Sequence, residues 1–204
     1  MLIVLSGKAR VGKDTVAAMI RDLIYDEYKE HFTLIAYADR LKTFIGEYFN
    51  LTDEHLYGEL KTVPLLDLEK SDGTYWTTRE LLQYFGTDVF RAVKNDYWVS
   101  YVKNIIIRFP GNYIITDARF PNEIEWVVSL DGLHIAIEGN SREDVGNAQH
   151  ASEKSLDDYE TDCIVFKNDV DTLNALQSKI KEQLLPIILS KLNEGEYDGQ
   201  TKTI

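Results

Sequence analysis

The chain has 204 residues, of which 44% are hydrophobic and 11% aromatic, and this length and composition predict a single domain with one sizeable core. The net charge of −12 argues against a nucleic-acid polymer as ligand, because binding to its phosphates requires a basic surface stripe. The sequence has no apolar run of about 18 residues, and one cysteine cannot form an internal disulfide, so we expect a cytoplasmic protein with no membrane partner. That cysteine, Cys163, lies in an apolar stretch and is predicted to belong to the core.

A glycine-rich loop follows the first apolar run, Leu2 to Ser6, and precedes a helical pattern over residues 13–28. It matches the phosphate-binding pattern G-x-x-x-x-G-K-[ST] except at the last position. Backbone N–H groups of such a loop point at nucleotide phosphates, and Lys13 would reach the β- and γ-phosphates of ATP. The alternative is a tight turn that needs glycine only for positive φ angles. The loop residues are Gly7, Lys8, Ala9, Arg10, Val11, Gly12, Lys13, Asp14 and Thr15.

The last position of this pattern bears on magnesium. Asp14 stands where a hydroxyl residue usually meets the metal, and Thr15 is the nearest substitute. The Asp14 carboxylate either binds Mg²⁺ through water or caps the N-terminus of the helix, and both interpretations stay open.

Short apolar runs alternate with helical patterns along the chain, which predicts a mainly parallel sheet covered by helices on both faces. In such a sheet, ligands bind outside the carboxyl ends of the strands. Gly7, Asp39, Asp117 and Asn168 follow predicted strands and are expected to converge on one crevice. The predicted strands are Leu2 to Ser6, Thr33 to Ala38, Tyr113 to Thr116, His134 to Ile137 and Cys163 to Phe166.

Two of these acids stand close to cations in the sequence. Asp39 is followed by Lys42 one turn into the next helix, and Asp117 is followed by Arg119 and a helix that starts with a proline. Both acids suit contacts with a substrate or with magnesium-bound water. The structural alternatives are a helix cap for Asp39, and a cap or a salt bridge to Arg119 for Asp117.

About seventy residues separate the second and third strands, which is more than one crossover helix needs and predicts a helical insertion. Within it, Arg79, Gln83, Thr87 and Arg91 recur every four residues along one helical stripe. These side chains suit a phosphate, a base edge and a sugar, whereas a solvated helix face is an equal alternative. Gly86 interrupts a good helical pattern, and we expect another group to approach the backbone closely at this position.

The end of the chain is predicted to be helical over residues 171–191, with Pro186 kinking or ending the helix. Residues 193–204 are polar and contain glycine, and we expect them to form a frayed tail.

The order of several motifs resembles that of bacteriophage deoxynucleoside monophosphate kinases, over residues 2 to about 170. Besides the glycine-rich loop, the motifs are Ala38-Asp39-x-Leu41-Lys42, Tyr57 to Lys61, Arg79-x3-Gln83-x2-Gly86-Thr87-x3-Arg91, Trp98, Thr116-Asp117-x-Arg119 to Glu123, and His150-x-Ser152-Glu153. The resemblance implies a three-layer α/β fold of the P-loop NTPase type, with a central five-stranded parallel sheet. One kinase domain would span residues 1–192, with its core at 1–40 and 110–192, a helical insertion for the monophosphate at about 41–109, a lid at about 139–153, and a flexible tail at 193–204.

The reaction that the resemblance implies moves the γ-phosphoryl group of ATP, with Mg²⁺, to a deoxynucleoside monophosphate. It requires mainly alignment and neutralisation of charge. A phage-encoded enzyme would act in the host cytoplasm. The implied catalytic residues are Lys13, Asp117, Arg119 and Arg142, the arginine available in the lid. Thr15 and Asp117 would contact the metal, directly or through water.

The resemblance also implies residues that bind the two nucleotides. Adenine is expected near Asn168. Trp76 and Trp98 would stack on a base, although packing in the core is the commoner role of a buried tryptophan. The predicted substrate-binding residues are Asp39, Lys42, Trp76, Arg79, Gln83, Thr87, Arg91, Trp98 and Glu123.

Two alternative functions remain at this level. A kinase of another small phosphorylated metabolite, of the dephospho-coenzyme A or phosphomevalonate type, would share the loop and fold but would not need the stripe at Gln83, Thr87 and Arg91. A non-catalytic regulatory protein would bind ATP without turnover. The sequence leaves open which base is accepted, whether the sugar is deoxyribose or ribose, and the oligomeric state. A homodimer is one option.

Overall fold

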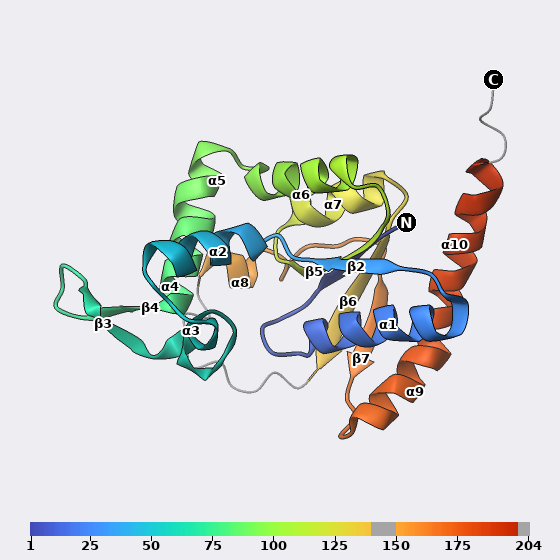
Figure 1. Cartoon of the computed structure of the whole chain (residues 1–204), viewed down its shortest axis with the longest axis horizontal. Helices are drawn as coiled ribbons and strands as arrows, with labels where there is room; N and C mark the ends of the chain where they lie inside the picture. Colours follow the sequence, from blue (N-terminus) through green and yellow to red (C-terminus); the bar gives the residue numbers. More distant parts are fainter. Residues whose placement is uncertain (140–149, 200–204) are drawn as a thin grey trace.

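The computed structural model describes residues 1–139 and 150–199, which form a central parallel sheet with helices on both faces (Figure 1). The strand order is β2-β5-β1-β6-β7, and every pairing in this sheet is parallel. The predicted three-layer α/β fold with five parallel strands is therefore confirmed. The strands are β1 (Leu2–Ser6), β2 (Phe32–Ile35), β5 (Asn112–Ala118), β6 (Leu133–Gly139) and β7 (Ile164–Asn168).

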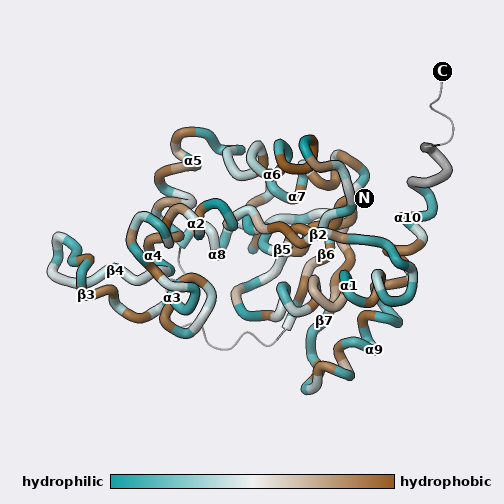
Figure 2. Tube along the Cα trace, in the orientation of Figure 1, coloured by the Kyte–Doolittle hydropathy of each residue, from teal (hydrophilic) through white to brown (hydrophobic). Residues whose placement is uncertain are grey.

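The alternation of side chains along the strands builds two hydrophobic cores, because successive residues of a strand point to opposite faces. Ile3 and Leu5 of β1 pack under α1 and α9, whereas Val4 packs under α6 and α7. Figure 2 shows the hydrophobic residues concentrated along the central strands. The covering helices are α1 (Lys13–Tyr28), α6 (Tyr97–Arg108), α7 (Pro121–Ser129), α9 (Leu173–Gln183) and α10 (Leu185–Gly199).

The C-terminal region differs from the prediction. The expected helix over residues 171–191 is divided at Leu184, and Pro186 lies in the first turn of α10, where a proline is tolerated because its missing N–H has no helical partner. Helix α10 continues to Gly199, so the expected frayed tail from residue 193 is helical up to that residue. Residues 200–204 lie outside the described part of the chain.

The insertion between β2 and β5 is mostly helical but also contains a β-hairpin, which the sequence analysis missed. Strands β3 and β4 are antiparallel, and Pro64 pairs with Thr77. Gly73 has a φ of +81° in the connecting turn, where glycine is favoured. The elements are α2 (Asp39–Tyr48), α3 (Asp53–Tyr57), η1 (Glu59–Thr62), β3 (Pro64–Glu69), β4 (Tyr75–Thr77), α4 (Thr78–Gln83), η2 (Tyr84–Val89) and α5 (Phe90–Val93).

The close approach predicted at Gly86 is made by two protein side chains. Gly86 lies in η2, a π-helical segment, and its carbonyl accepts a hydrogen bond of 2.8 Å from the Trp98 indole N–H. A Cβ atom at Gly86 would lie 2.8 Å from the Cδ2 atom of Leu41. The glycine therefore lets α2 and α6 pack against η2, which directly follows Gln83 at the end of α4.

Cys163 is exposed, which contradicts its predicted place in the core. It precedes β7, and β7 is an edge strand of the sheet, so the apolar run around it is covered on fewer sides than a central strand. A short helix, α8 (Ala151–Lys154), precedes this region. Within residues 1–139 and 150–199, no helix is both long enough and apolar enough to cross a membrane.

A buried histidine links two strands directly below the glycine-rich loop. His134 of β6 is 6% exposed, and its Nε2 atom lies 2.8 Å from the Oγ atom of Ser6, the last residue of β1. Burial lowers the pKa of His134 to about 4. In the unfolded chain this imidazole takes up a proton near pH 6.5.

We expect His134 to make the protein less stable in acid. Because its pKa is lower in the folded state, its contribution is complete above pH 6.5 and is lost as the pH falls towards 4, by about 3 kcal/mol. Urea unfolding between pH 4 and 7 measures this loss, which should be smaller in His134→Gln and unchanged in His31→Gln, a variant at an exposed position. Equal losses in the wild type and in His134→Gln would contradict the assignment.

Candidate active site

The glycine-rich loop has a backbone conformation that requires glycine at two positions. Gly7 and Gly12 have φ angles of +140° and +89°, which disfavour other residues. A Cβ atom at Gly7 would lie 2.3 Å from the carbonyl oxygen of Ile137 in β6, so the loop runs too close to the sheet for a side chain. Helix α1 starts directly after Gly12, so the positive end of the helix dipole points at the loop.

Lys13 is held across this loop. It is 9% exposed, and its ammonium donates hydrogen bonds of 2.8 Å and 2.7 Å to the carbonyl oxygens of Gly7 and Lys8. Asn168, at the end of β7, donates a hydrogen bond of 2.9 Å to the carbonyl of Val11. Asn168 thus supports the loop, and this contact differs from the adenine-binding role predicted for it.

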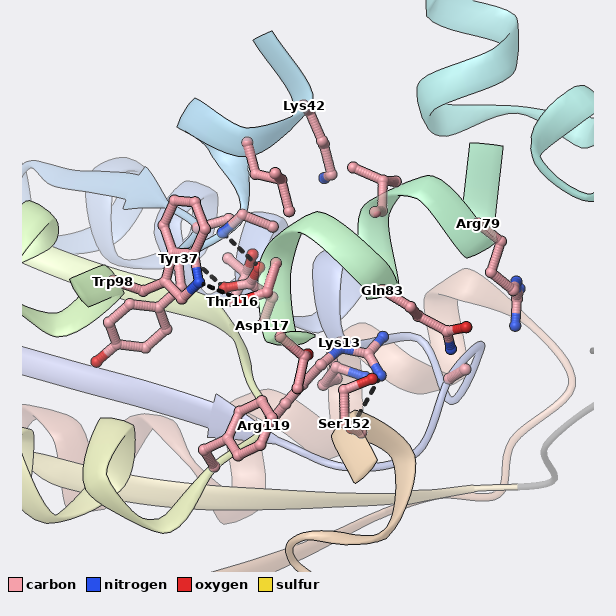
Figure 3. Close-up of a pocket in the computed structure, with 18 of the residues that line it drawn as sticks. Lys13, Tyr37, Lys42, Arg79, Gln83, Trp98, Thr116, Asp117, Arg119 and Ser152 are labelled. Carbon is pink, nitrogen blue, oxygen red and sulfur yellow. Dashed lines mark hydrogen bonds between the residues drawn. The ribbon is translucent and has the colours of Figure 1, made fainter. Parts of the chain in front are cut away.

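A cavity of about 360 Å³ lies between the loop and the insertion (Figure 3). Cations from several elements line it, although the whole chain has a net charge of −12. Gln83, Thr87 and Trp98 also line it, as their predicted roles require. The lining cations include Arg10, Lys13, Lys42, Lys61, Arg79 and Arg119.

Helix α4 brings Arg79 and Gln83 to this cavity. A capping box starts the helix: the Glu80 N–H donates to Thr77 Oγ1 at 3.2 Å, and the Thr77 N–H donates to Glu80 Oε2 at 2.8 Å. Gln83 is 8% exposed, yet its amide nitrogen and oxygen are both buried without a hydrogen-bond partner. A buried amide without partners is costly, so it points to a polar ligand in the cavity.

Asp117 joins β5 to the turn that follows β2. Its two carboxylate oxygens accept hydrogen bonds from the backbone N–H groups of Tyr37 at 2.6 Å and Ala38 at 3.0 Å. Burial raises the pKa of Asp117, and Lys42, these two N–H groups and Arg119 act against that increase. The carboxylate therefore lies at the cavity and also fixes the turn before Lys42.

Arg91 and Glu123 form a buried ion pair in the wall of the cavity. Arg91 also donates to the carbonyl of Asn95 at 2.7 Å, and its guanidinium lies 3.7 Å from the centre of the Phe120 ring. Glu123 accepts from the N–H of Arg119 at 2.7 Å, and burial raises the pKa of Glu123 to about 7 against the opposing effect of Arg91. This arrangement differs from the substrate-binding role predicted for both residues, because each binds mainly to protein.

Arg119 connects the cavity to α8. The Ser155 hydroxyl donates to the carbonyl of Arg119, and the Arg119 guanidinium donates to the carbonyl of Ser152 at 3.4 Å (Figure 3). Lys8 forms an ion pair with Asp157 beside a second cavity, which Gly7 and Val11 also line. The predicted lid arginine, Arg142, lies outside the described residues.

Besides Asn168 and several residues of the loop, three predicted site residues do not line the cavity. Asp39 accepts a hydrogen bond of 2.8 Å from the N–H of Ala36 and so stabilises the turn before α2, whereas the N-cap position predicted as its structural alternative is occupied by Ala38. The Trp76 ring packs 5.5 Å from that of Tyr84, at the base of the hairpin. Thr15 is exposed, and the neighbouring Asp14 lines the cavity instead.

Lys61 lines the cavity and was missing from the predicted site. It lies on η1, a segment whose short length and irregular geometry leave no periodic pattern in the sequence. Its place in the motif Tyr57 to Lys61 was the available signal. Among the described residues, no group of three or more His, Cys, Asp or Glu side chains is arranged to hold a metal ion.

A phosphate-binding loop at the end of the first strand of a parallel sheet, facing a cation-lined cavity in an insertion, defines a P-loop kinase of a small phosphorylated substrate. Residues 48–180 match the model of the family described as deoxynucleotide monophosphate kinase. A protein of Acanthamoeba polyphaga mimivirus, named "Putative deoxynucleotide monophosphate kinase", is 30% identical over 187 residues, which cover 82% of this chain and 88% of that protein. The chain belongs to the deoxynucleotide monophosphate kinase family and is a phosphotransferase. The family that the sequence resembles is thus confirmed, and the bacteriophage source stays a prediction.

We expect the Arg91–Glu123 pair to be strongly coupled in stability. Arg91→Met or Glu123→Gln alone leaves one buried charge without its partner and should cost about 3–5 kcal/mol of unfolding free energy. The double variant should lose clearly less than the sum of the two, as measured by urea unfolding in a double-mutant cycle. The exposed pair Lys181–Glu27 is the control and should give less than about 1 kcal/mol. Additive losses at Arg91 and Glu123 would contradict this interpretation.

Proposed function

We propose that this protein transfers the γ-phosphoryl group of ATP to the phosphate of a deoxynucleoside monophosphate, giving ADP and a deoxynucleoside diphosphate. The observation that carries the proposal is that Lys13 on the loop and the buried, unpartnered Gln83 amide face the same cation-lined cavity. Membership of the deoxynucleotide monophosphate kinase family supports the acceptor class. A single cysteine and the need for ATP are consistent with action in the cytoplasm.

The loop would bind the triphosphate of ATP. The Lys13 ammonium donates to two loop carbonyls and lies at the start of α1, so it is placed to neutralise charge on the β- and γ-phosphates. An oxygen of the acceptor phosphate attacks the γ-phosphorus, and the bond from that phosphorus to the β-γ bridging oxygen breaks. ADP keeps the bridging oxygen and its electron pair, and the protein has only to align the groups and stabilise charge.

The acceptor would bind along the insertion. Lys42 and Arg79 lie on different helices of the cavity wall and are suited to its phosphate, and Arg119 is suited to the transferred group. Gln83 and Thr87 then face the base and sugar. Trp98 is 5% exposed and donates its N–H to Gly86, so its main contribution is the shape of the wall.

The residues present fit a magnesium ion that nucleotide phosphates help to hold. Such an ion is usually bound through one or two carboxylates, several waters and the phosphates themselves, so a cluster of three acidic residues is not required. Each oxygen of Asp117 accepts one backbone hydrogen bond and keeps a further lone pair for a metal-bound water. Mg²⁺ would supply positive charge next to the transferring phosphoryl group.

Loss of Lys13 should abolish turnover. Lys13→Ala removes the cation nearest to the β- and γ-phosphates, so ADP production from Mg-ATP should fall by at least about 100-fold. We would measure it with each of the four deoxynucleoside monophosphates, their ribose counterparts and dephospho-coenzyme A. The control Lys181→Ala changes a lysine on α9 that pairs with Glu27. Turnover only with dephospho-coenzyme A, or none with any acceptor, would contradict the proposal.

Gln83 should bind the base through its amide. All four bases present an adjacent donor and acceptor, which one rotatable amide can meet, so Gln83→Leu should raise the KM for every accepted nucleotide by about tenfold. Gln83→Glu offers two acceptors, which match the two adjacent N–H donors of guanine, and should shift kcat/KM towards dGMP. Gln177→Leu, at an exposed position of α9, is the control. Unchanged base preference in Gln83→Glu would show that this amide does not contact the base.

A further inference from the structure

Lys61 reaches the candidate active site from an element that carries no predicted site residue. It lies on η1 and lines the cavity together with Lys42 of α2, Arg79 of α4 and Arg119 after β5. Within the described residues, the Lys61 ammonium makes no hydrogen bond or ion pair. The Lys42 ammonium lies 4.5 Å from the centre of the Tyr57 ring. This ring carries no net charge, so it does not neutralise Lys42.

The electrostatic environment of Lys61 is dominated by like charges. The pKa of Lys61 is lowered to about 8, first by burial and then by Lys42, Arg119 and Arg79 in that order of effect. Asp14 of α1 acts in the opposite direction, and the phenol of Tyr57 on α3 has a raised pKa and stays neutral. Asp14 is thus the acidic group that acts on Lys61, and Asp117, which also lines the cavity, acts on Lys42 and Arg119.

We infer that Lys61 is a further substrate-binding residue, whose ammonium binds the phosphate of the acceptor on the side that faces the glycine-rich loop. The inference rests on the proposed function, because it assigns this phosphate to the same cavity. A phosphate dianion provides several strong acceptor oxygens and two negative charges, and it would offset the repulsion that Lys42, Arg79 and Arg119 exert on Lys61. A neutral metabolite would leave the repulsion in place.

Binding of the dianion should be linked to proton uptake. The phosphate of a monophosphate is already a dianion above pH 7, because its second pKa is about 6. Lys61 loses its proton as the pH passes about 8 in the free protein, whereas the bound phosphate favours the charged ammonium. The dissociation constant should therefore increase above pH 8 and approach a tenfold change per pH unit.

The test compares Lys61→Met and Lys61→Arg with the wild type and with Lys103→Met, a lysine exposed on α6. Each deoxynucleoside monophosphate is titrated by calorimetry without ATP or magnesium, between pH 7 and 9.5, in two buffers of different ionisation enthalpy. Thermal unfolding of each variant checks its fold. Lys61→Met should bind at least about tenfold more weakly at pH 7, whereas Lys61→Arg should restore binding and lose both the pH dependence and the proton uptake.

The outcomes separate this inference from the proposed function. Weakened binding in folded Lys61→Met, with rescue by Lys61→Arg, supports the inference even if the wild type shows no turnover, which would overturn only the proposed transfer. Binding within twofold of the wild type in Lys61→Met, or no binding of any nucleotide by the wild type, overturns it. Equal proton uptake in the wild type and Lys61→Arg overturns it as well, since the titrating group would then lie elsewhere.

Discussion

Like-charged side chains that share a small cavity repel one another, and the architecture around the site depends on how this repulsion is balanced. The cavity collects lysines and arginines from α1, α2, η1, α4 and the end of β5, in a chain with a net charge of −12. The protein gathers these cations by placing each on a different element. The sheet and the packed insertion then hold the elements at fixed separations.

Partners for these cations come first from the protein itself. Lys13 donates to backbone carbonyls of the loop, and Arg91 is paired with Glu123. Glu123 also accepts from the N–H of Arg119, so one buried carboxylate holds Arg91 and the turn that presents Arg119. Lys61 has no such partner among the described residues, and its pKa is lowered first by burial and then by the neighbouring cations.

The sequence predicted the parts of the fold in which pattern and packing agree. Apolar strands with helical patterns between them specified the five-stranded sheet, and helix α1 has its predicted bounds, 13–28. The β3–β4 hairpin was missed because β3 is largely exposed and β4 has only three residues, so neither forms the buried apolar run typical of the main sheet. At the site, spacing placed Arg79, Gln83, Thr87 and Arg91 on one cavity wall, but only the structure shows that Arg91 is neutralised by Glu123, 32 residues away in the chain. Such long-range pairing leaves no periodic signal.

The acidic composition of the chain and its cation-lined cavity bear on which phosphates can approach. A polyanion such as nucleic acid carries charge along its whole length and would be repelled by a chain with 34 acidic and 22 basic residues. A mononucleotide carries its charge at one end, and a cavity of about 360 Å³ suits a ligand of that size. Because the lining cations are gathered in the cavity, a small phosphorylated ligand can meet several of them at once. The same charge distribution would therefore favour a mononucleotide over a polymer.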